Sequence, residues 1–216
     1  MKNTKVENIN FAQYSEEYCN KIGTFKNNSH YENIYPPHSI HFFEGLVLYS
    51  LAKENNIDIF IESGVRLGGS TSIWGRVFND IEVYSIEKHI HANSKSLWDE
   101  HIIKHLAPMY PFINLIEGDG IIEIPKIIEN NPSKKIGILI DGPKGNQAIN
   151  LAKKCLTYNN VSFASVHDLP ADSQLKSFQT LTYPGIDELV KLTNNLNIEH
   201  PGFQSYPQGY NLTVFI

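Results

Sequence analysis

Five short runs of β-branched and other apolar residues, separated by segments of helical length, constrain the fold of this chain more than any other feature. Runs of this kind are typical of strands that are buried on both faces of a sheet. Strands that alternate with helices predict βαβ units, and these form a parallel sheet with right-handed crossovers and helices on both faces. The runs lie at residues 57–61, 81–86, 113–116, 136–140 and 161–166, and the expected helices between them lie at 71–78, 94–106, 121–128 and 146–156.

The segments that flank this pattern differ from it. Residues 1–35 are polar with scattered aromatic residues, and we expect an N-terminal arm there that is ordered in part or forms a short helix. Residues 36–216 are expected to form one domain that begins with an amphipathic helix at 39–55. The expected C-terminal elements are a helix at 186–196, a strand that begins at 197–200 and a final strand at 210–216. The turn residues between these two strands predict an antiparallel pair at the sheet edge.

The charge balance argues against one class of partner. The 18 basic and 23 acidic residues give a net charge of −5, and a nucleic-acid-binding protein generally needs a basic surface, so we expect no nucleic-acid substrate. The N-terminal residues lack the apolar core of a signal peptide, and no apolar run reaches the ~20 residues that cross a bilayer. We therefore expect a cytoplasmic protein with no membrane association. The two cysteines, Cys19 and Cys155, match no metal or redox spacing.

Ligands of an open parallel sheet bind at the carboxyl ends of the strands, so the residues after each apolar run are the most informative about function. The first run is followed by the sequence ESGVRLGGST, from Glu62 to Thr71, in which glycines let the backbone approach a ligand before the next helix begins. A P-loop is excluded because Ser70 stands where that motif requires Lys. A dinucleotide fingerprint is disfavoured because Arg66 takes the place of its second glycine. The pattern E-x-G-x-x-x-G-x-[ST] that remains suits a nucleoside that carries an amino acid and no phosphate.

Acidic residues follow the second and third runs. Glu87 comes directly after the second run, where a carboxylate can accept hydrogen bonds from both hydroxyl groups of a ribose. Asp119 follows the third run between two glycines, where it can accept a hydrogen bond from the exocyclic amine of a base or cap the next helix. These two positions predict a nucleoside-binding edge.

Titratable residues follow the fourth and fifth runs. Asp141 comes directly after the fourth run, and Lys144 lies three positions further on in a turn. Burial lowers the pKa of a Lys, so we expect that Lys144 can act as a base. His167 and Asp168 follow the fifth run, where a His can carry protons near neutral pH and Asp168 would orient it or bind a metal.

Taken in order, Glu62-x-Gly-x-x-x-Gly-x-Ser70, Glu87, Gly118-Asp119, Asp141-Gly142 and His167-Asp168 resemble the motifs of class I S-adenosylmethionine-dependent methyltransferases, and most closely those of the small-molecule O-methyltransferase branch. The resemblance spans residues 57–216 and implies a Rossmann-like α/β three-layer sandwich with a mainly parallel seven-stranded sheet and a reversed last strand. It implies that Gly64, Gly68 and Ser70 hold the methionine part of the cofactor, that Glu87 binds the ribose and that Asp119 binds near the adenine. The implied cofactor-binding residues are Glu62, Gly64, Gly68, Ser70, Glu87, Asp119 and Asp141, and the implied catalytic residues are Lys144, His167 and Asp168.

The resemblance also bears on a metal. In metal-dependent relatives, acids after the fourth and fifth strands bind a divalent cation, and these positions match Asp141 and Asp168. Lys144 has the offset of the general base in catechol-type enzymes. The sequence departs from both branches, however, because Pro143 and Lys144 stand where His-Asp relatives often have Asp-His, and Leu169 stands where catechol-type enzymes have Asn. Only two oxygen ligands can be named, so the sequence does not favour Mg²⁺ or another divalent metal.

The sequence therefore predicts methyl transfer from S-adenosylmethionine to an oxygen of a small molecule, such as a sugar or a phenolic metabolite. Lys144 or His167 would remove the proton of the acceptor, with Asp168 in support. Two alternatives remain open. One is an NAD-dependent oxidoreductase in which Glu87 binds the NAD ribose. The other is a catalytically silent binding protein of the same fold, which the departure at Pro143 and Lys144 would suit.

Overall fold

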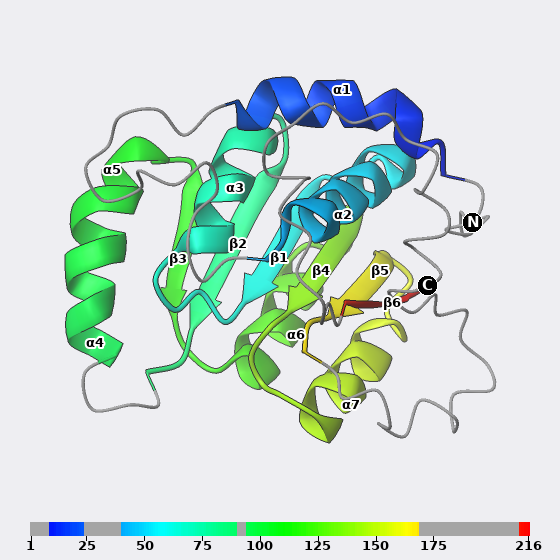
Figure 1. Cartoon of the computed structure of the whole chain (residues 1–216). Coiled ribbons are helices and arrows are strands. Elements are labelled where there is room, and N and C mark those ends of the chain that lie inside the picture. The colour runs from blue at the N-terminus through cyan, green and yellow to red at the C-terminus, as the bar shows by residue number, and fades with distance from the viewer. Residues whose placement is uncertain (1–8, 24–39, 90–93, 169–211) are drawn as a thin grey trace.

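The computed structural model describes residues 9–23, 40–89, 94–168 and 212–216, which form a six-stranded sheet with helices on both faces (Figure 1). The strands are β1 (Ile59–Ser63), β2 (Glu82–Glu87), β3 (Ile113–Glu117), β4 (Ile136–Ile140), β5 (Val161–Val166) and β6 (Thr213–Phe215). The helices are α1 (Phe11–Ile22), α2 (Phe42–Asn55), α3 (Gly69–Val77), α4 (Ser94–Leu97), α5 (Ala107–Met109), α6 (Gly120–Asn130) and α7 (Asn146–Cys155), and the π-helical segment η2 (Trp98–Leu106) joins α4 to α5.

The strand order is β3-β2-β1-β4-β5-β6, and every pair is parallel except β5 with β6. The chain builds outward from β1 to β3 and then returns to the other side of β1 with β4, which makes the β1/β4 junction the place where a ligand is expected. The prediction of a mainly parallel α/β sheet with a reversed last strand is confirmed. The strand expected from 197–200 and the helix expected at 186–196 lie outside the described residues.

The strands alternate their side chains between two hydrophobic cores, as strands covered on both faces must. Phe60 of β1 belongs to the core of α1, α2 and α3, whereas its neighbours Ile59 and Ile61 belong to the core of α6 and α7. Trp74 of α3 packs on Phe60 with the ring centroids 4.7 Å apart. Figure 1 shows these two sets of helices on opposite sides of the sheet.

Helix α2 departs from the expected amphipathic pattern. Every residue from Leu46 to Ala52 is buried, so the middle of this helix has no solvent-facing side. The reason is α1, which packs over α2 and places Tyr18 against Phe42 and Tyr49, with ring centroids 5.1 and 5.5 Å apart. A short helix in the polar N-terminal segment thus contributes to the core. The proposed domain boundary at residue 36 stays a prediction.

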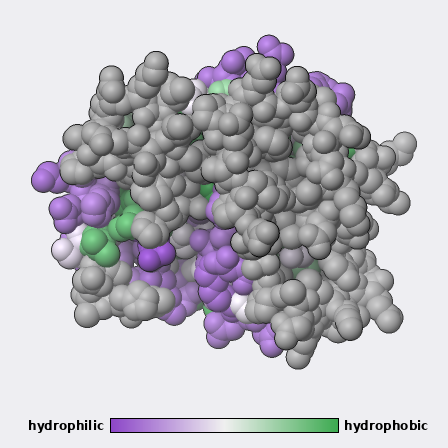
Figure 2. All heavy atoms as spheres, in the orientation of Figure 1, coloured by the Kyte–Doolittle hydropathy of each residue, from purple (hydrophilic) through white to green (hydrophobic). Residues whose placement is uncertain are grey.

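The surface of the described residues is mostly polar. On the face drawn in Figure 2 the residues coloured by hydropathy are mainly hydrophilic, and an apolar group lies on the side of α4 and α5. The large apolar side chains exposed in the described part are Ile103, Met109, Phe112, Ile121 and Ile122. None of the helices described here combines the length and apolarity that crossing a membrane requires.

Candidate active site at the carboxyl ends of the strands

Hydrogen bonds that continue the sheet ladder hold the residues after the strands in place. The backbone N–H of Gly64 donates to Ile86 O at 2.9 Å, and the N–H of Asp141 donates to Ser63 O at 2.8 Å. The N–H of His167 donates in the same way to the last residue of β4, at 3.0 Å. The loops after β1, β4 and β5 therefore begin at one edge of the sheet, and candidate residues from distant parts of the sequence become neighbours.

The loop of residues 64–68, called the glycine loop below, needs its glycines. Gly64 has φ of +95°, and a Cβ there would lie 2.7 Å from the backbone N of Gly142. Gly68 has φ of +77°, and a Cβ there would lie 2.5 Å from Cδ1 of Ile102 in η2. Glycine tolerates both the conformation and the close approach. The glycine loop can therefore pass directly beside the end of β4 and lead into the N-terminus of α3.

Glu62 lies inside the protein, behind the glycine loop. Its buried carboxylate accepts hydrogen bonds from Thr71 Oγ1 at 2.6 Å, Trp74 Nε1 at 2.9 Å and Ser85 Oγ at 3.0 Å. Burial raises the pKa of Glu62 above its usual value, although these hydrogen bonds oppose the rise. Ser70, at the start of α3, is also buried. Glu62 would therefore contribute to cofactor binding indirectly, because its hydrogen bonds fix the positions of α3 and β2.

Glu87 lies against the glycine loop. Its Oε2 accepts a hydrogen bond from the backbone N–H of Arg66 at 2.7 Å, and Arg66 adopts a left-handed conformation with φ of +51°. The Arg66 side chain is exposed. The structure thus brings together the positions predicted for the methionine part and the ribose of the cofactor.

Asp119 caps helix α6 at the end of β3. Its Oδ1 accepts from the N–H of Ile121 at 2.9 Å, and its Oδ2 pairs with Lys88 Nζ at 2.5 Å. The hydrogen bond from Lys88 lowers the pKa of Asp119. Asp119 therefore has the capping function that we expected as an alternative. It follows β3, the strand that pairs with β2 and its last residue Glu87. We call the glycine loop, Glu87 and Asp119 the nucleoside edge, because the sequence predicts that a nucleoside binds there.

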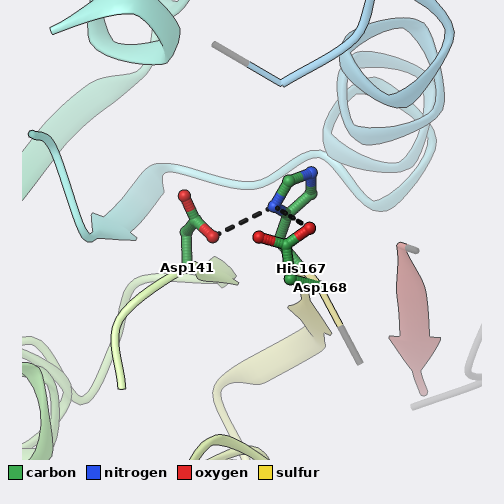
Figure 3. A group of neighbouring side chains, drawn as sticks. All are labelled: Asp141, His167 and Asp168. Atoms are coloured by element: carbon green, nitrogen blue, oxygen red, sulfur yellow. Dashed lines mark hydrogen bonds and ion pairs between the residues drawn. The ribbon is translucent and has the colours of Figure 1, made fainter. Parts of the chain in front are cut away.

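Charged side chains from the ends of β4 and β5 and from α2 form a second group, the carboxylate cluster of Glu44, Asp141, Lys144, His167 and Asp168. Figure 3 shows the His167 ring beside the carboxylates of Asp141 and Asp168. His167 Nδ1 lies 3.0 Å from Asp141 Oδ1 and 3.4 Å from Asp168 Oδ1. The Lys144 ammonium donates to Asp141 and, at 2.8 Å, to Asp168. Both predicted nitrogen bases are therefore paired with carboxylates.

The cluster keeps both nitrogen bases protonated. Burial would lower the pKa of His167, but hydrogen bonds to Asp141, Asp168 and Glu44 raise it to about 12. Burial would also lower the pKa of Lys144, and Asp141 and Asp168 outweigh it, so this pKa is raised. The pKa of Asp168 is held well below its usual range, chiefly by the hydrogen bond from His167. The sequence led us to expect a lowered pKa for Lys144, and the direction is the opposite because two carboxylates contact the ammonium.

Glu44 was not among the residues predicted from the sequence. It lies in the first turn of α2, is fully buried, and its Oε2 accepts from the backbone N–H of His41 at 2.8 Å and lies 3.2 Å from His167 Nε2. The one available signal is a lone carboxylate in the otherwise apolar run FFEGLVL of this helix. A carboxylate buried in such a run needs a partner, but only the fold identifies His167, 123 positions away, as that partner.

Comparison with known proteins identifies the fold. No protein-family model and no curated protein matches the sequence. The structure is similar to that of an O-methyltransferase from Bacillus cereus in complex with SAH, at 13% identity and a TM-score of 0.50, over 94% of this chain and 90% of that chain. An SAH-bound methyltransferase from Podospora anserina, PaMTH1, is similar at 13% identity and a TM-score of 0.47, over 80% and 76% of the two chains. The likeness to the Bacillus cereus enzyme shows that the chain has the Rossmann-like methyltransferase fold, as the sequence predicted.

Replacing Glu62 with Ala should strongly destabilise the protein, because three buried donors would lose their acceptor. Each unsatisfied donor costs about 1–3 kcal/mol, so we expect the free energy of unfolding in urea to fall by about 3 kcal/mol or more. The control Glu82→Ala removes an exposed carboxylate of β2 and should change this free energy by less than about 0.5 kcal/mol. Similar losses in the two variants would contradict the structural role of Glu62.

The stability contributed by His167 should decrease as the pH rises. Its pKa is raised on folding, so its contribution is complete below the pKa of the unfolded chain and is lost as the pH approaches the folded value of about 12. The stability excess of the wild type over His167→Gln, measured by urea unfolding, should therefore decline from about pH 7 to pH 10, by at most about 1.4 kcal/mol per pH unit. An excess that is constant or grows over this range would contradict the protonated state of His167.

Proposed function

We propose that this protein is an S-adenosylmethionine-dependent methyltransferase that methylates an oxygen of a small molecule. The observation that carries the proposal is the arrangement of polar residues along one edge of the sheet. The glycine loop, Glu87 and Asp119 follow β1, β2 and β3, and the carboxylate cluster gathers at the ends of β4 and β5. The predicted cofactor-binding residues and the carboxylate cluster thus lie on the two sides of the β1/β4 junction, where the strand order reverses.

The nucleoside edge fits S-adenosylmethionine. Gly64 has no room for a Cβ beside the end of β4 and Gly68 has none beside Ile102 of η2, so the backbone of the loop lies close to both, and the N-terminus of α3 follows directly. Glu87 would accept hydrogen bonds from the ribose hydroxyl groups, and Asp119 would accept from the adenine amine. When bound, S-adenosylmethionine supplies a methyl group activated by a sulfonium. Its methionine part would lie along the glycine loop, whose Gly64 adjoins Asp141.

The acceptor would bind beside the carboxylate cluster. A general base there has to take the proton of the acceptor hydroxyl, and Lys144 would do so in its neutral form. Because Asp141 and Asp168 raise the pKa of Lys144, only a small fraction is neutral near pH 7. An acceptor that ionises readily suits such a site, so a phenol with a pKa of about 10 fits it better than a sugar hydroxyl.

Calorimetric titration with S-adenosylmethionine tests the cofactor assignment. We expect saturable binding by the wild type and an affinity lowered by about tenfold or more in Glu87→Ala, because hydrogen bonds to a charged group contribute about 1.5–3 kcal/mol. The control Glu82→Ala should bind like the wild type. No binding, or equal affinity in Glu87→Ala, would refute the assignment, and stabilisation by NAD instead of S-adenosylmethionine in thermal unfolding would favour an oxidoreductase.

Transfer of a labelled methyl group to a panel of phenols and sugars tests the acceptor chemistry. We expect transfer to a phenol, at a rate that rises from about pH 7 to pH 10 as neutral Lys144 becomes more abundant, and a loss of about 100-fold or more in Lys144→Met. The affinity of this variant for S-adenosylmethionine should stay within about twofold of the wild type. Full activity in Lys144→Met would rule out Lys144 as the base. Cofactor binding without transfer to any acceptor would favour a silent binding protein, a role with which the paired Lys144 and His167 are compatible.

A further inference from the structure

We propose that Lys144 and His167 supply from the chain itself the positive charge that would otherwise come from a divalent cation between Asp141 and Asp168, with Glu44 as the residue that positions His167 for this role. This inference concerns the resting protein and does not depend on the proposed methyl transfer. It assigns to α2 a part in the active site that the sequence pattern did not indicate.

The first argument is the failure of the cluster to fit a metal ion. Ligand atoms of Asp141, His167 and Asp168 all lie within 4.8 Å of one another, which is the spacing a metal site would need. A His ligand, however, must offer an unprotonated nitrogen. Nδ1 of His167 faces Asp141 and Asp168, and Nε2 faces Glu44, so each ring nitrogen is within reach of a carboxylate that accepts its proton, and the pKa of His167 is raised. The imidazolium has no lone pair to donate to a metal.

The second argument is the position of Lys144. Its ammonium donates to both Asp141 and Asp168 and so bridges the two carboxylates that a cation would share. A metal could enter only by displacing the ammonium, and it would then find two carboxylates where Mg²⁺ or Mn²⁺ prefers several oxygen ligands. The Lys144 and Asp168 side chains are 51% and 54% exposed, so an added cation can reach them and the competition can be measured.

The third argument is the charge balance of the groups that surround His167. The cluster contains three carboxylates and two cations, and these two cations together carry the charge of one divalent ion. The remaining titratable neighbour, His41 at the start of α2, has a pKa lowered mainly by burial and adds no positive charge near neutral pH. The chain thus supplies the same charge without a metal.

Glu44 makes this arrangement possible. It is completely buried, His41 N–H binds its Oε2, and Oε1 has no hydrogen-bond partner within the part of the chain that the structure describes. Without the charge of Glu44, His167 Nε2 would face a neutral group, and the pKa of His167 would be lower. Glu44 therefore positions and charges His167 from the opposite side of the ring to Asp141.

Titration of the protein with MnCl₂ alone, followed by electron paramagnetic resonance of the free ion, tests the replacement of a metal. The wild type should show no saturable binding below about millimolar Mn²⁺, a typical upper range for weak carboxylate sites. Lys144→Met should gain affinity by about tenfold or more, because the bridge between Asp141 and Asp168 is gone, and a second change, Asp168→Asn, should abolish the gain. The matched control Lys88→Met, which frees Asp119 from its partner, should not bind.

Two results would overturn the proposal. One is wild-type binding of Mn²⁺ below the millimolar range that Asp141→Asn removes. The other is the absence of any gain in Lys144→Met. Neither result depends on S-adenosylmethionine or on an acceptor, so a failure here is distinguishable from a failure of the proposed reaction.

The ¹⁵N resonances of the His167 ring test the role of Glu44 separately, with His167→Gln used to assign the signals. At neutral pH both ring nitrogens should carry a proton in the wild type, and in Glu44→Gln the ring should lose one proton at a lower pH than in the wild type, because one of its three carboxylate partners has lost its charge. Circular dichroism of Glu44→Gln establishes that the variant folds, and Glu44→Asp should restore the wild-type titration in part. A singly protonated ring in the wild type, or the same titration in Glu44→Gln, would contradict the positioning role.

Discussion

The pairing of β1 with β4 is the constraint on which the candidate site depends. The carbonyl of Ser63 accepts hydrogen bonds from both Asp141 N–H at 2.8 Å and Gly142 N–H at 3.0 Å, so the two chains remain in register past the ends of the strands. Such close approach is possible because Gly64 carries no side chain against the backbone of Gly142. β1 also pairs with β2, which ends in Glu87. One central strand therefore fixes the nucleoside edge on one side and the carboxylate cluster on the other.

The carboxylate cluster has an energetic consequence for the whole domain. Buried charges are costly unless they are paired, and a group that loses its partner is more costly than an apolar replacement of the pair. Glu44 and His167 come from distant parts of the chain, and each needs the other in its buried position. Their pairing fixes the N-terminus of α2 at the sheet edge, while Tyr18 and the rest of α1 cover α2 from outside. His167 thus both holds α2 at the sheet edge, through Glu44, and belongs to the carboxylate cluster, through Asp141.

The fold was predictable from the sequence to a greater extent than the site was. The apolar runs predicted five of the strands and their direction, and the run at 210–216 predicted β6, because local hydrophobicity and helical spacing are properties of short segments. The glycine loop was predictable because its glycines are conformational requirements. Glu44 was not, since a pairing across 123 positions depends on tertiary structure. The same limit explains the burial of the middle of α2, which α1 covers, and the share of the raised pKa of Lys144 that Asp168 contributes from 24 positions away.

The burial of Glu62 also has a consequence for how the protein moves. Its carboxylate holds donors from α3 and β2 at once, so α3 cannot lift from the sheet without exposing several unsatisfied groups together. Local opening in this region should therefore be cooperative, with β1, α3 and β2 exchanging their amide hydrogens as one unit of similar protection. A ligand that binds the glycine loop would stabilise that entire unit, since anything that binds only the closed form adds to its stability. The interior carboxylate thus couples binding at the glycine loop to the rigidity of β1, α3 and β2.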